Sequence, residues 1–132
     1  MTAAQRVDVA IVGAGPAGAC LAARLGRMGI EVALLERSAS WRWHAAGVFA
    51  SPAAMDALRR SGVPEHVLER VARPIPALRL ETPGGASVRL TYGHDAGGPP
   101  AVGFDRSALD PALVALARAA AVDVRLGTTV DA

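Results

Sequence analysis

The stretch that decides the fold covers residues 7–36 and reads VDVAIVGAGPAGACLAARLGRMGIEVALLE. It opens with the apolar, β-branched run Val7–Val12, which a glycine cluster ends, and this is typical of a buried parallel strand. Helix formers follow over Ala17–Met28 with apolar side chains spaced to share one face, and Gly29 suits the end of that helix. The run Glu31–Glu36 is a second apolar run that ends in an acid. The stretch therefore predicts a strand, a helix and a second buried strand.

Each glycine of the sequence GAGPAG has a separate physical role. Gly13 allows a sharp turn off the strand, Gly15 lets a pyrophosphate approach the backbone, and Gly18 allows the helix to pack close to the strands. Pro16 lacks an N–H group and suits an early helical position. The N–H groups of the first helical turn, together with the helix dipole, then favour phosphate.

Glu36 lies eighteen positions after Gly18, at the end of the second strand. A carboxylate there can accept hydrogen bonds from a ribose diol and would repel a 2′-phosphate, which disfavours NADP at this site. A G-x-G-x-x-G motif alone is weak evidence, but here a strand, a helix and an acid surround it as a dinucleotide site requires. The predicted cofactor contacts from this motif are Gly13, Ala14, Gly15, Pro16, Ala17, Gly18 and Glu36. The motif does not separate FAD from NAD.

Composition narrows the function classes. The chain has 132 residues, which allows one domain or part of one, and 52% of them are hydrophobic. The net charge is +2 and the basic residues are scattered, so nothing indicates a nucleic-acid partner or stable membrane association. Cys20 is the single cysteine, which excludes an intrachain disulfide, and no Cys/His cluster has metal-ligand spacing. We expect no metal site.

The apolar N-terminus resembles a signal peptide only superficially. Asp8 interrupts its apolar run, and the glycines at 13–18 would break a signal-peptide helix. No apolar run reaches the length of a membrane span. We expect a soluble, cytoplasmic protein with a loose tail at residues 1–5.

The middle of the chain changes pattern twice. Residues 37–50 have no clear helix or strand period but contain both tryptophans, which favours a functional loop beside the cofactor over a plain linker. Ser51 and Pro52 then begin a helix that Gly62 ends, and a short helix follows over residues 64–71. From Ala77 to Thr91 apolar and polar residues alternate around a Pro-Gly-Gly turn, which predicts a β-hairpin with one face covered and one face in solvent.

The last third returns to the pattern of the first. After a loop over residues 93–100, we expect a short strand at 101–104, an alanine-rich helix up to about Ala121 and a strand at 122–126. The helix start is ambiguous, because Ser107 with Asp110 resembles a capping box, while Asp110 as cap with a proline after it fits equally well. Thr129-Val130 is a candidate start of one more strand. We expect a truncated polypeptide, since no closing helix precedes Ala132.

Three segments together resemble a known family. The glycine loop with Glu36-Arg37, the segment Ala46-Gly47-Val48 with the helix after it, and Asp105-Arg106-Ser107-Ala108-Leu109-Asp110 are similar to the N-terminal part of FAD-dependent oxidoreductases of the para-hydroxybenzoate hydroxylase type. That group includes geranylgeranyl-reductase-like enzymes and flavin-dependent halogenases. The resemblance covers nearly the whole chain.

The resemblance implies an α/β, Rossmann-like FAD-binding fold with a parallel sheet, an inserted helical segment and a hairpin insertion at 77–92. Residues 1–132 would form the N-terminal part of an FAD/NAD(P)-binding domain. The bound FAD would place its pyrophosphate on the glycine loop and its adenosine ribose on Glu36, with Arg37 beside it. Arg106 would reach the flavin side of the cofactor.

The resemblance also implies NAD(P)H as reductant and a small organic molecule as substrate, so the complete protein would be a monooxygenase or reductase. The family has a later Gly-Asp segment that holds the flavin, so the chain alone is expected to be inactive. No catalytic residue is assigned. The choice among hydroxylase, reductase and halogenase stays open, although Trp41-Arg42-Trp43 lacks the Ile-Pro that follows in the halogenase motif. The rival hypothesis is a stand-alone Rossmann-type NAD-binding module without catalysis.

Overall fold

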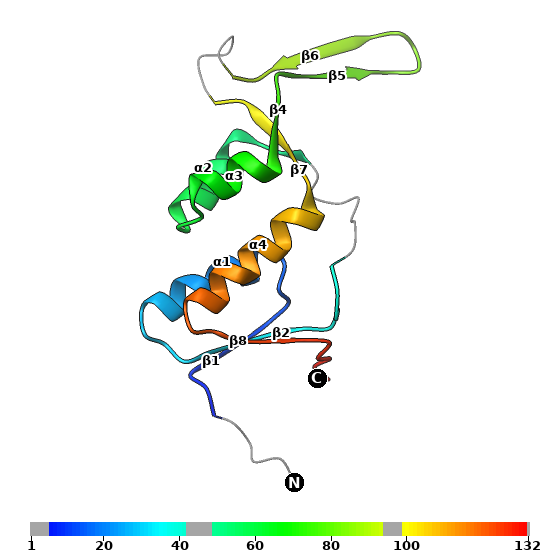
Figure 1. Cartoon of the computed structure of the whole chain (residues 1–132). Coiled ribbons are helices and arrows are strands. Elements are labelled where there is room, and N and C mark those ends of the chain that lie inside the picture. Colours follow the sequence, from blue (N-terminus) through cyan, green and yellow to red (C-terminus); the bar gives the residue numbers. More distant parts are fainter. Residues whose placement is uncertain (1–5, 42–48, 94–98, 132) are drawn as a thin grey trace.

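The computed structural model describes residues 6–41, 49–93 and 99–131. The tail predicted at 1–5 and residues 42–48, which are half of the tryptophan-containing loop predicted at 37–50, lie outside the described residues. So do residues 94–98 of the loop predicted at 93–100. The described elements form a parallel sheet with two helices, a small antiparallel sheet with two shorter helices, and a projecting hairpin (Figure 1).

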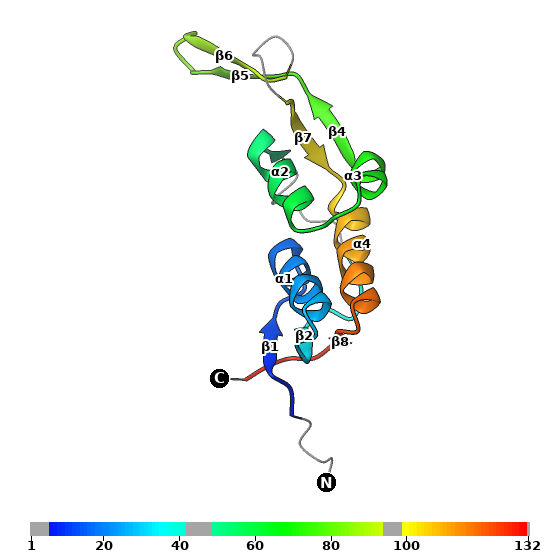
Figure 2. The ribbon, with the colours of Figure 1, turned by 90° about the vertical axis from the view of Figure 1, so that its left-hand side faces the viewer.

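The parallel sheet contains β1 (Val9–Val12), β2 (Val32–Glu36) and β8 (Asp123–Leu126) in the order β1-β2-β8. Helices α1 (Pro16–Arg27) and α4 (Arg106–Ala119) lie side by side over one face of this sheet (Figures 1 and 2). The strand, helix and strand predicted from residues 7–36 are therefore confirmed. The third parallel strand comes from the far end of the chain and pairs with β2.

One part of the core lies between this sheet and its two helices. Leu34 on the central strand is fully buried, and so are Ala19 and Ala22 on the facing side of α1. Leu109 and Leu113 of α4 close the core from the other helix. Alanines on α1 have short side chains, so the helix backbones can approach the sheet and each other closely. No described helix covers the opposite face of the sheet (Figure 2).

The second layer is an antiparallel sheet with the order β3-β7-β4, formed by Phe49–Ala50, Ala101–Phe104 and Ala72–Ile75 respectively. The strand at 101–104 was predicted, whereas β3 and β4 were not. Helices α2 (Pro52–Arg60) and α3 (Glu65–Val71) pack beside it and match the two predicted helices. Pro52 takes the first position of α2 as expected, but the Ser51 side chain makes no capping hydrogen bond.

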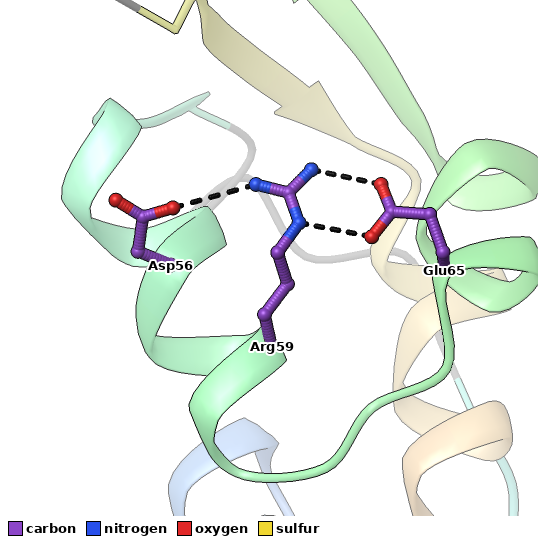
Figure 3. A network of polar contacts seen from close by, with 3 residues as sticks. All are labelled: Asp56, Arg59 and Glu65. Atoms are coloured by element: carbon purple, nitrogen blue, oxygen red, sulfur yellow. Dashed lines mark hydrogen bonds and ion pairs between the residues drawn. The ribbon is translucent and has the colours of Figure 1, made fainter.

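Two arginines hold the turn between α2 and α3. Arg59 lies between Asp56 and Glu65, and its guanidinium contacts the Glu65 carboxylate through two nitrogens at 2.8 and 2.9 Å (Figure 3). Arg27 at the end of α1 donates to the carbonyl oxygens of Ser61 and Gly62 in the same turn. These hydrogen bonds of Arg27 connect α1, which packs on the parallel sheet, to the turn between α2 and α3.

The hairpin forms as predicted from β5 (Ala77–Glu81) and β6 (Ser87–Thr91) and projects from the rest of the chain (Figure 1). The expectation that one of its faces is covered is wrong. Leu80 and Val88 face each other across the strands, and they are 54% and 58% exposed. The alternation did place the apolar side chains on one face, but no described element packs against that face.

The start of α4 also differs from both expectations. Asp105 is the N-cap, and its carboxylate accepts a hydrogen bond from the N–H group of Ser107. Because the helix begins at Arg106, Asp110 and Pro111 lie inside it, and Asp110 forms an ion pair with Arg106. The candidate strand at Thr129-Val130 does not form. Among the described residues, no helix is long and apolar enough to cross a membrane.

Candidate functional site

The turn from β1 into α1 is set by two glycines. Gly13 has φ of +99°, a conformation that favours glycine, and its N–H group donates to the carbonyl of Leu35 at 2.8 Å. An ideal Cβ on Gly18 would overlap the carbonyl oxygen of Gly13. The chain can therefore leave the strand and begin the helix at this distance only with glycine at both positions.

Gly15 has a different role in the loop. Its backbone is extended, with φ of −68° and ψ of −179°, and a Cβ built on it meets nothing within 4 Å. Pro16 is the first helical residue, and the first helical hydrogen bond runs from the N–H of Ala19 to the carbonyl of Gly15. The N–H groups of Ala17 and Gly18 thus precede the helical ladder and have no acceptor within it. Open space beside such donors suits an anion.

Glu36 connects this loop to the end of β2. Its two carboxylate oxygens each accept a backbone hydrogen bond of 2.8 Å, one from the N–H of Ala14 and one from the N–H of Ser38. Burial raises the pKa of Glu36, but these hydrogen bonds and the charge of Arg37 outweigh it, so the pKa lies below its ordinary value. The carboxylate is ionised at neutral pH and is held at the mouth of the glycine loop.

Five of the nine predicted cofactor residues line one cavity of about 350 Å³. Its lining combines backbone of the glycine loop, the carboxylate at the end of β2, the segment after β2 and the first turns of α4. The lining residues are Gly13, Gly15, Glu36, Arg37, Ser38, Ser40, Trp41, Arg106 and Asp110. Residues that are almost a hundred positions apart in the sequence therefore face the same space.

Arg106 and Asp110 form a bidentate ion pair on one face of α4. The Nε and Nη2 atoms of Arg106 each donate to a different carboxylate oxygen of Asp110, both at 2.8 Å. The two side chains are 16% and 4% exposed. The hydrogen bonds with Asp110 hold the pKa of Arg106 above its ordinary value. The pair presents a fixed guanidinium beside the glycine loop.

Two of the cavities that adjoin the first extend the site. One of about 220 Å³ lies at the ends of β1 and β2 and shares Gly13, Glu36 and Arg37 with it, while Thr128 and Val130 close its other side. The larger one, of about 490 Å³, is mostly apolar. It lies between the start of α1, β3, α2 and α4, and the residues that line it include Pro16, Ala17, Cys20, Phe49, Ala54 and Arg106. Arg106 lines this apolar cavity as well as the polar one.

The structure thus brings together most of the predicted site. Four predicted residues do not line the polar cavity. Pro16 and Ala17 line the apolar cavity instead, Gly18 lines neither, and Ala14 is fully buried with its N–H group donating to Glu36. Sequence reasoning missed Asp110 and Ser38. The four-residue spacing of Arg106 and Asp110 on a helix was a usable signal, since such pairs share a face. Among the described residues, no group of three or more potential metal ligands occurs.

Comparisons with known proteins agree with this geometry. A family model described as "FAD binding domain" matches residues 6–132. A search of curated proteins found no match.

Solved structures similar to this chain include a geranylgeranyl bacteriochlorophyll reductase-like protein from Thermoplasma acidophilum, with a TM-score of 0.74 and 23% identity over 92% of this chain and 30% of that one. The tetrameric 2-methyl-3-hydroxypyridine-5-carboxylic acid oxygenase gives a TM-score of 0.69 and 29% identity over 89% of this chain and 30% of the other. A complex of aklavinone-11 hydroxylase with FAD and aklavinone gives 0.67 and 27% over 94% and 26%. The chain therefore spans less than a third of the length of these structures.

Proposed function

The chain belongs to the FAD-binding domain family, and we propose that it is the cofactor-binding part of a flavin-dependent monooxygenase. FAD is its cofactor. One observation carries the proposal: the glycine loop, the ionised Glu36 and the Arg106 guanidinium line a single cavity. The oxygenase and the hydroxylase among the similar structures support a monooxygenase, whereas the reductase-like structure at 23% identity supports only the fold.

The residues fit the diphosphate of FAD. The space beside Gly15 is open, and the first-turn N–H groups of α1 have no acceptor within the helix. Two phosphates can therefore accept hydrogen bonds from the backbone there. We assign the diphosphate to Gly15, Ala17 and Gly18. Gly13 and Ala14 contribute by shaping the loop, because both of their N–H groups already donate within the protein.

The adenosine end fits the cavity at the strand ends. The Glu36 carboxylate still has lone pairs to accept hydrogen bonds from a ribose diol, and the backbone hydrogen bonds from Ala14 and Ser38 fix its position. We place the adenine in the adjoining cavity of about 220 Å³ that Arg37, Thr128 and Val130 line. The ionised Glu36 would repel a 2′-phosphate, so the site favours an unphosphorylated ribose.

We place Arg106 at the flavin end of the diphosphate. It lines both the polar cavity and the apolar cavity next to it, so its guanidinium can donate to the diphosphate where the cofactor turns toward its flavin. Bound FAD supplies the redox chemistry, with NAD(P)H proposed as reductant and a small organic molecule as substrate. The described residues bind and orient the cofactor, and we assign no catalytic residue among them.

The experiment uses the full-length protein. It should be isolated yellow, release FAD on denaturation, and be reduced anaerobically by NADH or NADPH. A monooxygenase should then consume oxygen in a substrate-dependent manner and insert one oxygen atom into the product, which mass spectrometry with labelled oxygen detects. Oxygen-independent hydrogenation of a double bond would indicate the reductase instead. Failure to bind added FAD would contradict the proposal entirely.

A further inference from the structure

Asp110 is in an unexpected place for a carboxylate. It is 3% exposed and is the one charged residue that is buried among those the structure describes. It lines the same cavity as Gly15, Glu36 and Arg106. In the proposed function that cavity receives a diphosphate, and a buried negative charge beside another anion is electrostatically unfavourable. Its presence there needs a reason that outweighs this repulsion.

The ion pair supplies that reason. Asp110 binds Arg106 through two parallel hydrogen bonds, which fix the plane of the guanidinium as well as its position. A free arginine side chain has many rotamers, and ordering one on cofactor binding weakens affinity. An arginine that is already held in place avoids that loss. The pair carries no net charge, so its contribution to binding comes from the fixed direction of the guanidinium and not from a net charge.

The start of α4 makes the arrangement rigid. Asp105 caps the helix through the N–H of Ser107, which fixes Arg106 at the first helical position. Asp110 lies four residues later on the same face, next to the fully packed Leu109 and Leu113. The cap and the packed leucines therefore fix the backbone positions of both partners.

We propose that Asp110 is a positioning residue that orients Arg106 toward the diphosphate of FAD. The inference rests on the proposed function, because it takes Arg106 as a cofactor contact. It makes a counterintuitive prediction. Removing the negative charge of Asp110 should weaken the binding of an anionic cofactor, whereas a simple charge argument expects binding to become tighter.

The test is a double-mutant cycle in the full-length protein, with FAD titrated into the apoprotein. Asp110→Asn and Arg106→Gln keep a similar size and a hydrogen-bonding amide, which limits the damage to the fold. We expect Asp110→Asn to weaken FAD binding about tenfold and Arg106→Gln to weaken it by at least as much. The double variant should bind no more weakly than Arg106→Gln alone, because Asp110 acts only through Arg106.

Two further readouts exclude a merely structural role. AMP binds at the adenosine end and lacks the diphosphate, so its affinity should be unchanged in Asp110→Asn. Asp110→Glu retains the carboxylate and should recover part of the FAD affinity. Thermal unfolding of each apoprotein provides the stability control.

Several results would overturn the inference. Unchanged or tighter FAD binding by Asp110→Asn contradicts it, as does an additive loss in the double variant or an equal loss of AMP affinity. If Arg106→Gln alone has no effect, the inference fails while FAD binding by the wild type still supports the proposed function. If the wild type itself takes up no FAD, the proposed function fails first.

Discussion

The parallel sheet and the β5–β6 hairpin differ in how far their apolar side chains are buried. In the parallel sheet, Leu34 lies on the central strand and is fully buried beneath α1 and α4. In the β5–β6 hairpin, Leu80 is 54% exposed and Val88 58% exposed, although both lie on one apolar face. The strand–helix–strand unit brings its own cover, because the helix between two parallel strands must pack on the sheet. A hairpin contains no such element.

The difference shows where the cofactor site can be rigid. The glycine loop, Glu36 and the start of α4 all adjoin the buried layer, so the packed core holds their positions. The hairpin projects away from the parallel sheet and α1, and little described structure packs against it (Figure 1). A two-stranded hairpin is only marginally stable without a neighbour. Substitutions in the two regions should therefore have very different effects.

The largest difference in stability is expected when a leucine is replaced by alanine in each region. Leu34→Ala should lower the free energy of unfolding by about 2–5 kcal/mol, because it leaves a cavity in the core. Leu80→Ala should cost less than about 1 kcal/mol, since it removes only an exposed cross-strand contact. Chemical unfolding of the two variants measures both values. Equal losses would mean that the hairpin face is packed in solution.

A second pair compares glycines. Gly18→Ala should destabilise the protein by about 1–3 kcal/mol, because its Cβ would overlap the carbonyl oxygen of Gly13. Gly84→Ala in the hairpin turn is the control, since its nearest neighbour would be the Thr82 hydroxyl oxygen at 3.9 Å. Thermal unfolding should separate the two clearly. A Gly18→Ala variant as stable as Gly84→Ala would show that the Gly13 carbonyl can move away from a Cβ on residue 18 at little cost.

A smaller effect on stability, but a clear one on binding, is expected at Glu36. Glu36→Ala should weaken FAD binding about tenfold to a hundredfold, which corresponds to the roughly 1.5–3 kcal/mol of a hydrogen bond from a charged group. The same change should speed hydrogen exchange of the Ala14 amide in the apoprotein, because its acceptor is gone. Unchanged exchange together with unchanged affinity would remove Glu36 from the site.

The smallest effect is the pH dependence of that contact. The pKa of Glu36 is lowered in the folded chain, so its stabilisation is complete above the unfolded-state pKa of about 4.3. It is lost as the pH falls through the lower folded-state value. Protection of the Ala14 amide should therefore persist at the ordinary pKa of a glutamate and decline only below it, and Glu36→Gln should abolish that decline. A decline centred near neutral pH would contradict the lowered pKa.

Local patterns predicted the parts of the fold that local physics determines. The apolar runs around the glycine cluster were sufficient for β1, α1 and β2, because spacing and turn chemistry both point to them. The two-residue β3 and the proline-containing β4 were not predictable. Each forms only by pairing with β7, which brings together residues far apart in the chain.

The same limit applies to the site. Gly13, Gly15, Glu36, Arg37 and Arg106 were predicted from motif and resemblance, and they line one cavity. Asp110 was considered only as a helix cap, because sequence alone offered several acids and hydroxyls near the helix start. In the structure Asp105 is the cap, and Asp110 forms an ion pair with Arg106 inside the helix. Predicting that ion pair requires knowing where the helix begins.

Gly15 tests the central claim that the glycine loop binds the diphosphate of FAD through its backbone. Its extended conformation is open to any residue, and a Cβ there meets no protein atom within 4 Å. Gly15→Ala and Gly15→Val should therefore remain folded by far-UV circular dichroism. FAD titration of the same samples should show weaker binding for alanine and none for valine. A folded Gly15→Val variant that binds FAD with wild-type affinity would contradict the account.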